Sequence, residues 1–188
     1  MLDKKLIRKA MLAYRKQMPE AEYQRRNQAL TGHLLKFLLQ LEVSSVHLFY
    51  PIIKHKEPDV TSALEELWRE NIQTVTSITD FGKRTMSHFA VDASTVFSEN
   101  HLGIPEPQNG IHVAMNQVEA ILVPLVLADK VGNRVGYGGG FYDQLLKETK
   151  AIKIGLCLSN PVDKIIQTDD WDIPLNYLIT PYKHYTHG

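Results

Sequence analysis

Residues 120–143 read AILVPLVLADKVGNRVGYGGGFYD, and this stretch indicates the architecture more clearly than any other part of the chain. Its first part, 120–128, is almost wholly apolar, which is typical of a β-strand that is covered on both faces. A glycine-rich loop follows, and the pattern then predicts a helix over about 139–150 and a second apolar strand over 152–158. Helices that alternate with continuous apolar strands favour an α/β fold around a mainly parallel sheet.

The rest of the chain continues this alternation. Hydrophobic spacing predicts helices over 3–18, 20–41 and 61–71. It predicts strands over 45–50, 72–78 and 177–180. The segment 80–118 is less regular: a strand fits 87–91, whereas Gly103–Pro107 is typical of a loop. We therefore expect one domain over residues 1–188, a three-layer sandwich around the sheet with helices at its N-terminus.

The composition argues against several classes of protein. The 188 residues contain 21 basic and 21 acidic side chains, so the net charge is zero and indicates neither nucleic acid nor an anionic membrane as partner. The charged N-terminus has no apolar signal-peptide core, and no run approaches the roughly 18–20 apolar residues of a membrane helix. Cys157 is the single cysteine and has no disulfide partner, which fits a reducing compartment. We expect a cytoplasmic monomer that acts on small molecules.

The glycine-rich loop is the first candidate for a binding site. Five of the 11 glycines fall within 132–140, where open α/β sheets bind ligands beyond the carboxyl ends of their strands. Glycine lets the backbone approach a ligand, and the N–H groups that begin a helix attract anions, so phosphate is the natural ligand. The P-loop and dinucleotide motifs do not fit, because the next lysine is Lys147 and Phe141 stands where glycine is needed. A connection without a ligand stays open, although three consecutive glycines cost backbone entropy.

Two charged residues flank this loop. Arg134 has a permanent positive charge that suits phosphate or carboxylate. Asp143 falls in the first helical turn, where the helix dipole favours a carboxylate even without a function. Beside a phosphate site an aspartate is also a usual ligand of Mg²⁺, so both interpretations of Asp143 stay open.

The stretch 123–143 resembles the signature of 5-formyltetrahydrofolate cyclo-ligases, also called methenyltetrahydrofolate synthetases. The family pattern is D-K-x-G-x-R-[LV]-G-x-G-x-G-[FY]-Y-D, and residues 129–143 meet every fixed position. Lys4-Lys5-Leu6-Ile7-Arg8 resembles the family's K-x-x-[LI]-R element, whose lysine and arginine contact ATP. Taken alone, this segment also fits a solvated helix with two cations on one face. Gly103–Pro107 resembles the family's G-I-x-E-P turn.

Two further segments resemble parts of the family that contact ligands. Tyr50 and Glu57 match folate-contacting positions, where an aromatic ring packs on the pterin and a carboxylate accepts its N–H groups. Residues 169–176 resemble the family's P-x-x-x-H-D-x-x-[LV]-D region. In that region Asp172 falls on the aspartate that is tied to the metal.

The resemblance implies ATP- and Mg²⁺-dependent cyclisation of 5-formyltetrahydrofolate to 5,10-methenyltetrahydrofolate, with release of ADP and phosphate. It implies phosphorylation of the formyl oxygen and attack by N10. The implied catalytic residues are Lys4, Arg134 and Asp143, and the implied magnesium ligands are Asp143 and Asp172. The implied ATP contacts are Lys4, Lys5, Leu6, Ile7, Arg8, Arg134, Val135, Gly136, Tyr137, Gly138, Gly139, Gly140, Phe141 and Tyr142. The implied folate contacts are Tyr50, Glu57, Tyr137, Gly138, Gly139, Gly140 and Phe141.

The chain departs from the family pattern at three positions, where Trp171 replaces histidine, Asn176 replaces aspartate and Gln144 replaces a frequent arginine. The first two departures leave open a protein that binds nucleotide and folate without turnover. A different enzyme on a related scaffold, such as a sugar-phosphate isomerase or an acyl-CoA transferase, is a second alternative. It would need its own acid–base or nucleophilic carboxylate, and it would not explain Lys4 and Arg8 together with Asp143.

Two other kinds of site find less support. The eight histidines show no zinc-ligand spacing, and the close pair His184 and His187 falls in an expected frayed tail. Cys157 lies in an apolar run, which predicts a buried, inert thiol rather than a nucleophile.

Overall fold

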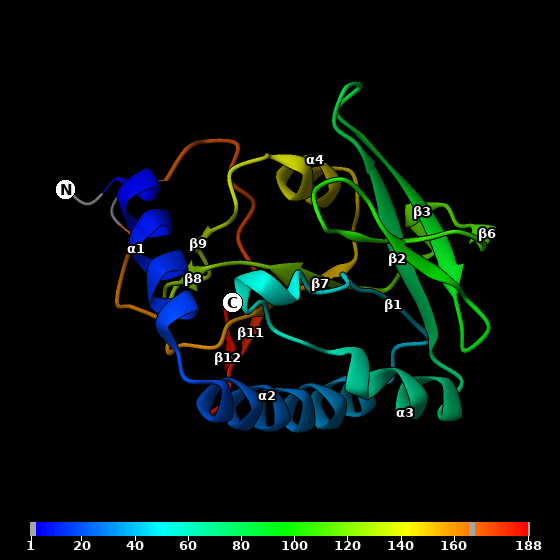
Figure 1. The fold of residues 1–188 in the computed structure, drawn as a ribbon, viewed down its shortest axis with the longest axis horizontal. Helices are drawn as coiled ribbons and strands as arrows, with labels where there is room; N and C mark the ends of the chain where they lie inside the picture. Colours follow the sequence, from blue (N-terminus) through cyan, green and yellow to red (C-terminus); the bar gives the residue numbers. More distant parts are fainter. Residues whose placement is uncertain (1–2, 166–167, 188) are drawn as a thin grey trace.

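The computed structural model describes residues 3–165 and 168–187, which build a large central sheet (Figure 1). The strands of the sheet are β1 (Ser45–His47), β2 (Gln73–Asp80), β3 (Thr85–Val91), β6 (Ile111–His112), β7 (Ala120–Pro124), β10 (Ile152–Leu156), β11 (Tyr177–Ile179) and β12 (His184–Thr186). They lie in the order β12-β11-β10-β7-β1-β2-β3-β6. Neighbouring strands from β11 to β2 run parallel, whereas β12, β3 and β6 are antiparallel additions at the two ends.

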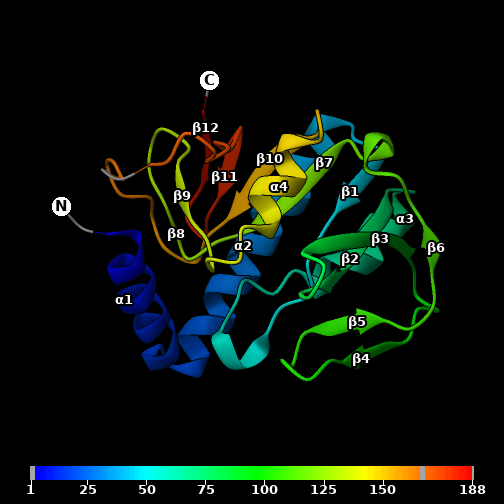
Figure 2. The same cartoon turned by 90° about the horizontal axis from the view of Figure 1, so that it is seen from above.

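Helices cover both faces of the sheet and complete three layers. Helices α2 (Glu20–Leu41) and α3 (Leu64–Arg69) lie along one face, and α4 (Phe141–Lys147) lies on the other (Figure 1, Figure 2). Helix α1 (Lys4–Gln17) contacts a ribbon of β8 (Leu127–Ala128) and β9 (Arg134–Val135), and a second ribbon joins β4 (Phe97–Glu99) to β5 (Pro105–Pro107). The expected three-layer α/β fold around a mainly parallel sheet is confirmed, as are its N-terminal helices.

Strand β7 shows why this sequence forms a sheet that is covered on both sides. Side chains alternate between the faces of a strand. Ala120 and Leu122 accordingly join the core under α2, whereas Ile121 and Val123 join the core under α4. All four are fully buried, so a strand with this unbroken apolar sequence requires a layer on each face.

Helix α2 supplies one of these layers through leucines at helical spacing. Leu30, Leu34 and Leu38 are fully buried and pack with sheet residues such as Ile154. Leu39, the next residue along the chain, points outward and is 42% exposed. The helix is therefore held by one apolar stripe rather than by its whole surface.

The apolar run 120–128 is not the single strand that its composition predicts. Strand β7 ends at Pro124, and the chain then leaves the sheet to form β8. Proline has no N–H to donate to a further rung of the ladder. After this point Val126 donates its N–H to Val135 in β9 at 2.8 Å, so the second half of the run pairs with the segment that leads into the glycine loop.

Other boundaries also differ from the sequence-based expectation. Strand β1 stops at His47 rather than at residue 50, and α4 is shorter than the expected 139–150. Pro105–Pro107, expected in a loop, forms β5. The expected frayed tail is also wrong, because β12 pairs with the open edge of β11 and satisfies its backbone groups.

Two expectations about single features can be compared with the structure. Cys157 is a free, fully buried thiol whose pKa is raised by burial, which confirms the expected inert packing residue. Among the helices that the structure describes, none combines the length and the apolar character needed to cross a membrane.

Two neighbouring leucines of α2 provide a test of this packing. We predict that Leu38→Ala lowers the free energy of unfolding by about 2–5 kcal/mol, because it opens a cavity in a filled core. The same substitution at the half-exposed Leu39 should cost less than about 1 kcal/mol. Urea denaturation of both variants measures the difference, and equal losses would contradict the observed orientation of α2.

Candidate active site

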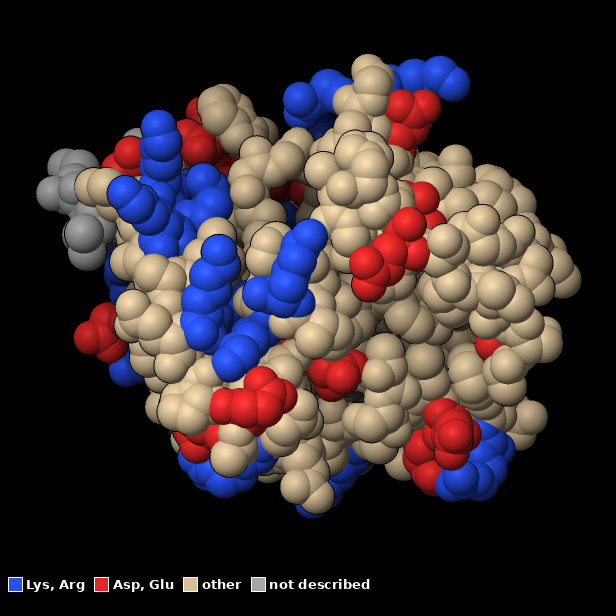
Figure 3. Space-filling model, in the orientation of Figure 1, with Lys and Arg blue, Asp and Glu red and all other residues tan. Residues whose placement is uncertain are grey.

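A cavity of about 710 Å³ opens beside the glycine-rich loop. Pro124 at the carboxyl end of β7, residues 48–50 after β1, and Thr76 and Ser77 in β2 line its floor. The carboxyl ends of parallel strands thus meet the ligand-sized space, as expected for an open α/β sheet. Figure 3 shows a hollow between positive residues over α1 and others over the tip of the β2–β3 hairpin.

The glycine-rich loop, residues 136–140, forms one wall and is held to α1 by an arginine. Arg8 donates from Nε to the carbonyl oxygen of Gly136 at 2.7 Å. Gly138 has a φ of 95°, and a Cβ at this position would lie 3.1 Å from Cζ of Arg8. Only glycine accommodates both the left-handed backbone and the close guanidinium. The loop and the arginine therefore form one unit on the cavity wall.

Lys4 extends the cationic face of α1 into the same cavity. Its ammonium group lies 3.0 Å from the carboxylate of Asp169 and also contacts that of Asp172. Burial alone would lower the pKa of Lys4, but the hydrogen bonds and charges of the two aspartates outweigh it, so the pKa lies above its ordinary value. Lys4 is consequently a fixed positive charge at neutral pH.

Arg134 and Asp143 form a second ion pair that lines the cavity. The side chain of Arg134 is almost fully buried and also donates to the carbonyl oxygen of Ile173. Asp143 lies in the first turn of α4, as predicted. The two expected metal ligands, Asp143 and Asp172, thus both line the cavity and both contact a cation.

The donor set suits a magnesium ion better than zinc. Within residues 3–165 and 168–187, no three histidine, cysteine or acidic side chains gather into a metal cluster. Two carboxylates at one cavity are enough for Mg²⁺, because this ion commonly takes one or two protein carboxylates and completes its shell with phosphate and water. Asp143 and Asp172 fit this requirement.

The opposite part of the cavity is apolar, with one buried acid. Leu48, Phe49 and Ile52 line it, and Tyr50 packs against Phe97 with ring centroids 3.9 Å apart. Glu57 also lines this part and is only 4% exposed. Its carboxylate accepts the backbone N–H of Ile52 at 2.7 Å. This part can therefore hold a flat, largely apolar ring whose edge carries N–H donors.

Several residues of the expected set do not line the cavity. Lys5 and Leu6 are exposed on the outer side of α1, while Ile7 and Val135 pack in a small core between α1 and the loop. Tyr142 lines the cavity and also packs on the core beneath it. The expected set therefore divides into residues that face the cavity and residues that support its wall.

Two arginines near the cavity were not among the expected residues. Arg15 is 1% exposed and donates to the hydroxyl of Tyr137 at 2.7 Å and to the carbonyl oxygen of Leu125. It lies on the same face of α1 as Lys4 and Arg8, so helical spacing could have identified it. Arg84 donates to the carbonyl oxygen of Gly139 at 3.2 Å from the β2–β3 hairpin, and no sequence signal indicates this contact.

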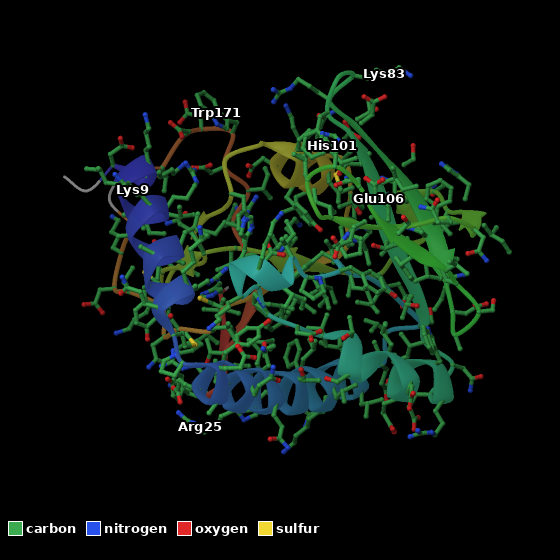
Figure 4. All side chains as sticks on the ribbon, viewed as in Figure 1. Lys9, Arg25, Lys83, His101, Glu106 and Trp171 are labelled. Atoms are coloured by element: carbon green, nitrogen blue, oxygen red, sulfur yellow. The ribbon has the colours of Figure 1, made fainter. Side chains whose placement is uncertain are left out.

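Position 171, where tryptophan stands in place of the histidine of the family pattern, lies at the rim of the cavity. Trp171 is 68% exposed and lines the cavity. In space it lies between α1 and α4, across from Lys83 at the tip of the β2–β3 hairpin (Figure 4). Asn176 is outside the cavity: its side-chain oxygen accepts the backbone N–H of Lys153 at 2.9 Å. The Asn176 departure thus concerns strand pairing rather than the cavity.

The sequence of this chain matches a known protein family over most of its length. The model of the 5-formyltetrahydrofolate cyclo-ligase family matches residues 1–181. A 5-formyltetrahydrofolate cyclo-ligase of Haemophilus influenzae is 27% identical over 175 residues, which are 90% of this chain and 92% of that protein.

Solved structures of similar fold carry related names. The NMR structure of a 5,10-methenyltetrahydrofolate synthetase from Aquifex aeolicus has a TM-score of 0.84 and 30% identity, covering 98% of this chain and 92% of that one. A 5,10-methenyltetrahydrofolate synthetase from Mycoplasma pneumoniae has a TM-score of 0.75 at 23% identity, covering 96% and 99%, and this likeness concerns the fold.

The buried carboxyl of Glu57 makes stability depend on pH. Burial raises its pKa and outweighs the opposing effects of the Ile52 N–H, the Tyr137 hydroxyl and the Arg15 charge. Between the ordinary and the raised pKa the folded protein binds more protons than the unfolded chain, so the free energy of unfolding falls as pH rises through this window.

We predict that Glu57→Gln removes this fall, because an amide stays neutral and still accepts a hydrogen bond from Ile52. The stability difference, variant minus wild type, should grow in urea denaturation as the pH rises above the ordinary glutamate pKa of about 4.3. Exposed Glu65→Gln is the control and should show no such trend. A difference for Glu57→Gln that stays constant with pH would contradict the burial argument.

Proposed function

This chain belongs to the 5-formyltetrahydrofolate cyclo-ligase family, whose named relatives are ligases, and on that premise we propose the reaction that its cavity performs. The proposed reaction is the ATP- and Mg²⁺-dependent conversion of 5-formyltetrahydrofolate to 5,10-methenyltetrahydrofolate, ADP and phosphate. One observation carries the proposal: a single cavity joins a cationic glycine loop to an apolar wall with a buried acid. The first half suits phosphates, and the second suits a pterin.

The phosphate half consists of permanent charges and backbone donors. Lys4, Arg8 and Arg134 supply three cations that can neutralise a triphosphate. The backbone N–H groups of the glycines in the loop 136–140 can hold its oxygens, because glycine has no side chain that prevents a close approach. Asp143 and Asp172 would hold Mg²⁺, which supplies further neutralisation of phosphate charge when bound.

The folate half would orient the substrate. Tyr50 and Phe141 offer aromatic surface for the pterin ring, and Glu57 offers a carboxylate for its N–H groups. Tyr137 links the two halves, because it lines the cavity and its hydroxyl is held by Arg15. The formyl group of a pterin bound here would lie toward the phosphates of ATP.

The chemistry needs activation of a poor electrophile. Transfer of the γ-phosphoryl group of ATP to the formyl oxygen releases ADP and turns that oxygen into a leaving group. N10 then attacks the formyl carbon, a C–N bond forms, N10 loses its proton, and the C–O bond breaks with release of phosphate. No step needs a covalent protein nucleophile, so the residues serve by positioning and by stabilising charge.

The two alternatives are less well supported. An isomerase or a transferase would need a carboxylate free for acid–base or nucleophilic work, and family membership speaks against it. A binding protein without turnover drew support from Trp171 and Asn176, but Asn176 lies outside the cavity. We also propose a cytoplasmic, monomeric, single-domain enzyme over residues 1–188 that binds neither nucleic acid nor membrane.

Asp143 gives the sharpest test of the phosphate half. We predict that Asp143→Asn, which keeps the shape of the side chain, lowers kcat at least about 100-fold in an absorbance assay of the methenyl product. Asp163→Asn is the matched control, because that carboxylate is 91% exposed and pairs with Lys130. Normal turnover in Asp143→Asn would remove this residue from the site. No product from folded, ATP-binding wild type would favour the binding protein without turnover.

Lys4 tests the contribution of α1. We predict that Lys4→Ala lowers kcat/KM for ATP about 10- to 100-fold, because one partly buried cation beside the phosphates is lost. Lys9→Ala removes an exposed lysine from the same helix and should leave this value unchanged. Equal effects of the two substitutions would indicate a general charge effect rather than a contact.

A further inference from the structure

Three polar side chains form a chain across adjacent strands of the sheet. His47 in β1 places Nε2 2.6 Å from Oγ of Ser77 in β2, and the same oxygen lies 2.7 Å from Nδ1 of His88 in β3. Ser77 and His88 are directly opposite each other in the β2–β3 ladder. Ser77 lines the large cavity, whereas His88 lines a smaller hollow of about 130 Å³ between β3 and α4. The proposed mechanism uses none of the three.

Burial of these polar side chains costs free energy because they lose their hydrogen bonds to water. His47 is fully buried, and its Nδ1 has no hydrogen-bond partner among the described residues. An apolar residue of similar volume would avoid the desolvation of these groups. Buried polar groups that reduce stability are often found at functional sites. Ser77 lines the large cavity, which indicates that the cluster belongs to this site.

Both imidazoles are neutral at physiological pH. Burial, with a smaller effect of His88, lowers the pKa of His47 to about 3. Burial and the nearby His112 also lower the pKa of His88, and Glu148 opposes them only in part. Each ring therefore carries one N–H donor and one bare nitrogen acceptor.

The unpartnered Nδ1 of His47 decides the direction of the hydrogen bond between His47 and Ser77. A buried N–H without a partner is rare, so we assign the bare nitrogen to Nδ1 of His47. Its Nε2–H then donates to Oγ of Ser77. We assign the Ser77 hydroxyl proton to the hydrogen bond with Nδ1 of His88, which a neutral imidazole can leave unprotonated. One lone pair of Oγ remains, and it is available to a ligand in the cavity.

We propose that Ser77 presents a fixed hydrogen-bond acceptor to the folate and recognises an N–H group on the edge of the pterin ring. His47 and His88 are positioning residues that keep the hydroxyl proton away from the cavity. The inference rests on the proposed function and adds a specificity-determining residue to it. A reduced pterin carries several ring and amino N–H donors, and the carboxylate of Glu57 is a further side-chain acceptor that lines the same cavity.

The first experiment compares two serines of neighbouring strands. Ser77→Ala should raise the KM for 5-formyltetrahydrofolate about 5- to 10-fold, as expected for one lost hydrogen bond, and leave the KM for ATP within twofold. Ser87→Ala is the matched control, because Ser87 lies in β3, is exposed and does not line the cavity. A folate KM unchanged by Ser77→Ala, with wild type active, would overturn the proposal.

The second experiment tests the direction of the hydroxyl and does not remove Ser77. His88→Phe takes away the acceptor for its proton and should raise the folate KM several-fold. His88→Asn places an amide oxygen near the position of Nδ1 and should restore a nearly normal value. A raised KM in Ser77→Ala together with a normal KM in His88→Phe would mean that Ser77 donates to the folate, which overturns the acceptor assignment.

The outcomes separate this inference from the proposed function. If wild type forms no methenyl product, the proposed function fails, and equilibrium binding of 5-formyltetrahydrofolate to the same variants replaces KM. A wild type that does not bind this folate removes both proposals. Thermal melting of each variant identifies loss of folding, and His88→Asn still tests the direction if Ser77→Ala does not fold.

Discussion

The site depends on the docking of α1 against the glycine-rich loop. Arg15 is buried where it joins this helix to Tyr137 and to the backbone at Leu125, and Arg8 contacts the backbone of Gly136. A buried guanidinium requires all its partners, because an unpaired charge in the interior is very costly. Hydrogen bonds to the glycine-rich loop and to Leu125 therefore help to fix the position of α1, and this position brings Lys4 to the cavity.

Charge in the cavity is balanced in pairs. Asp143 contacts Arg134, and Asp172 contacts Lys4, so each carboxylate proposed for the metal already has a cation beside it. Phosphate and Mg²⁺ together bring both signs of charge. The phosphate would pair with the cations of these ion pairs and Mg²⁺ with their carboxylates, so no buried charge would be left alone. Under the proposed function, this arrangement would let a protein of zero net charge hold a highly charged substrate in a partly apolar cavity.

The sequence predicts those features that depend on neighbouring residues. The three layers follow from the two-sided burial of β7, and the loop follows from glycines that stand within nine positions of each other. Lys4, Arg8, Arg134 and Asp143, which line the cavity, were expected from continuous motifs. Contacts that depend on register across strands could not be predicted: Ser77 meets His88 only because β2 and β3 pair as they do. The break at Pro124 and the added strand β12 likewise depend on partners far away in the chain.

The contacts of α1 also bear on how the protein is made. They join residues that are 110 positions apart for Arg15 and Leu125, 128 for Arg8 and Gly136, and 168 for Lys4 and Asp172. Such distant contacts form late, because a long stretch of chain must first be ordered. During synthesis, Arg8 and Arg15 must thus wait for residues 125–137, and Lys4 must wait for residue 172, before these cations have their partners. The part of the cavity wall that α1 supplies is therefore completed after the strands and the loop on which α1 packs, and a chain that stops before residue 172 lacks the Lys4–Asp172 contact.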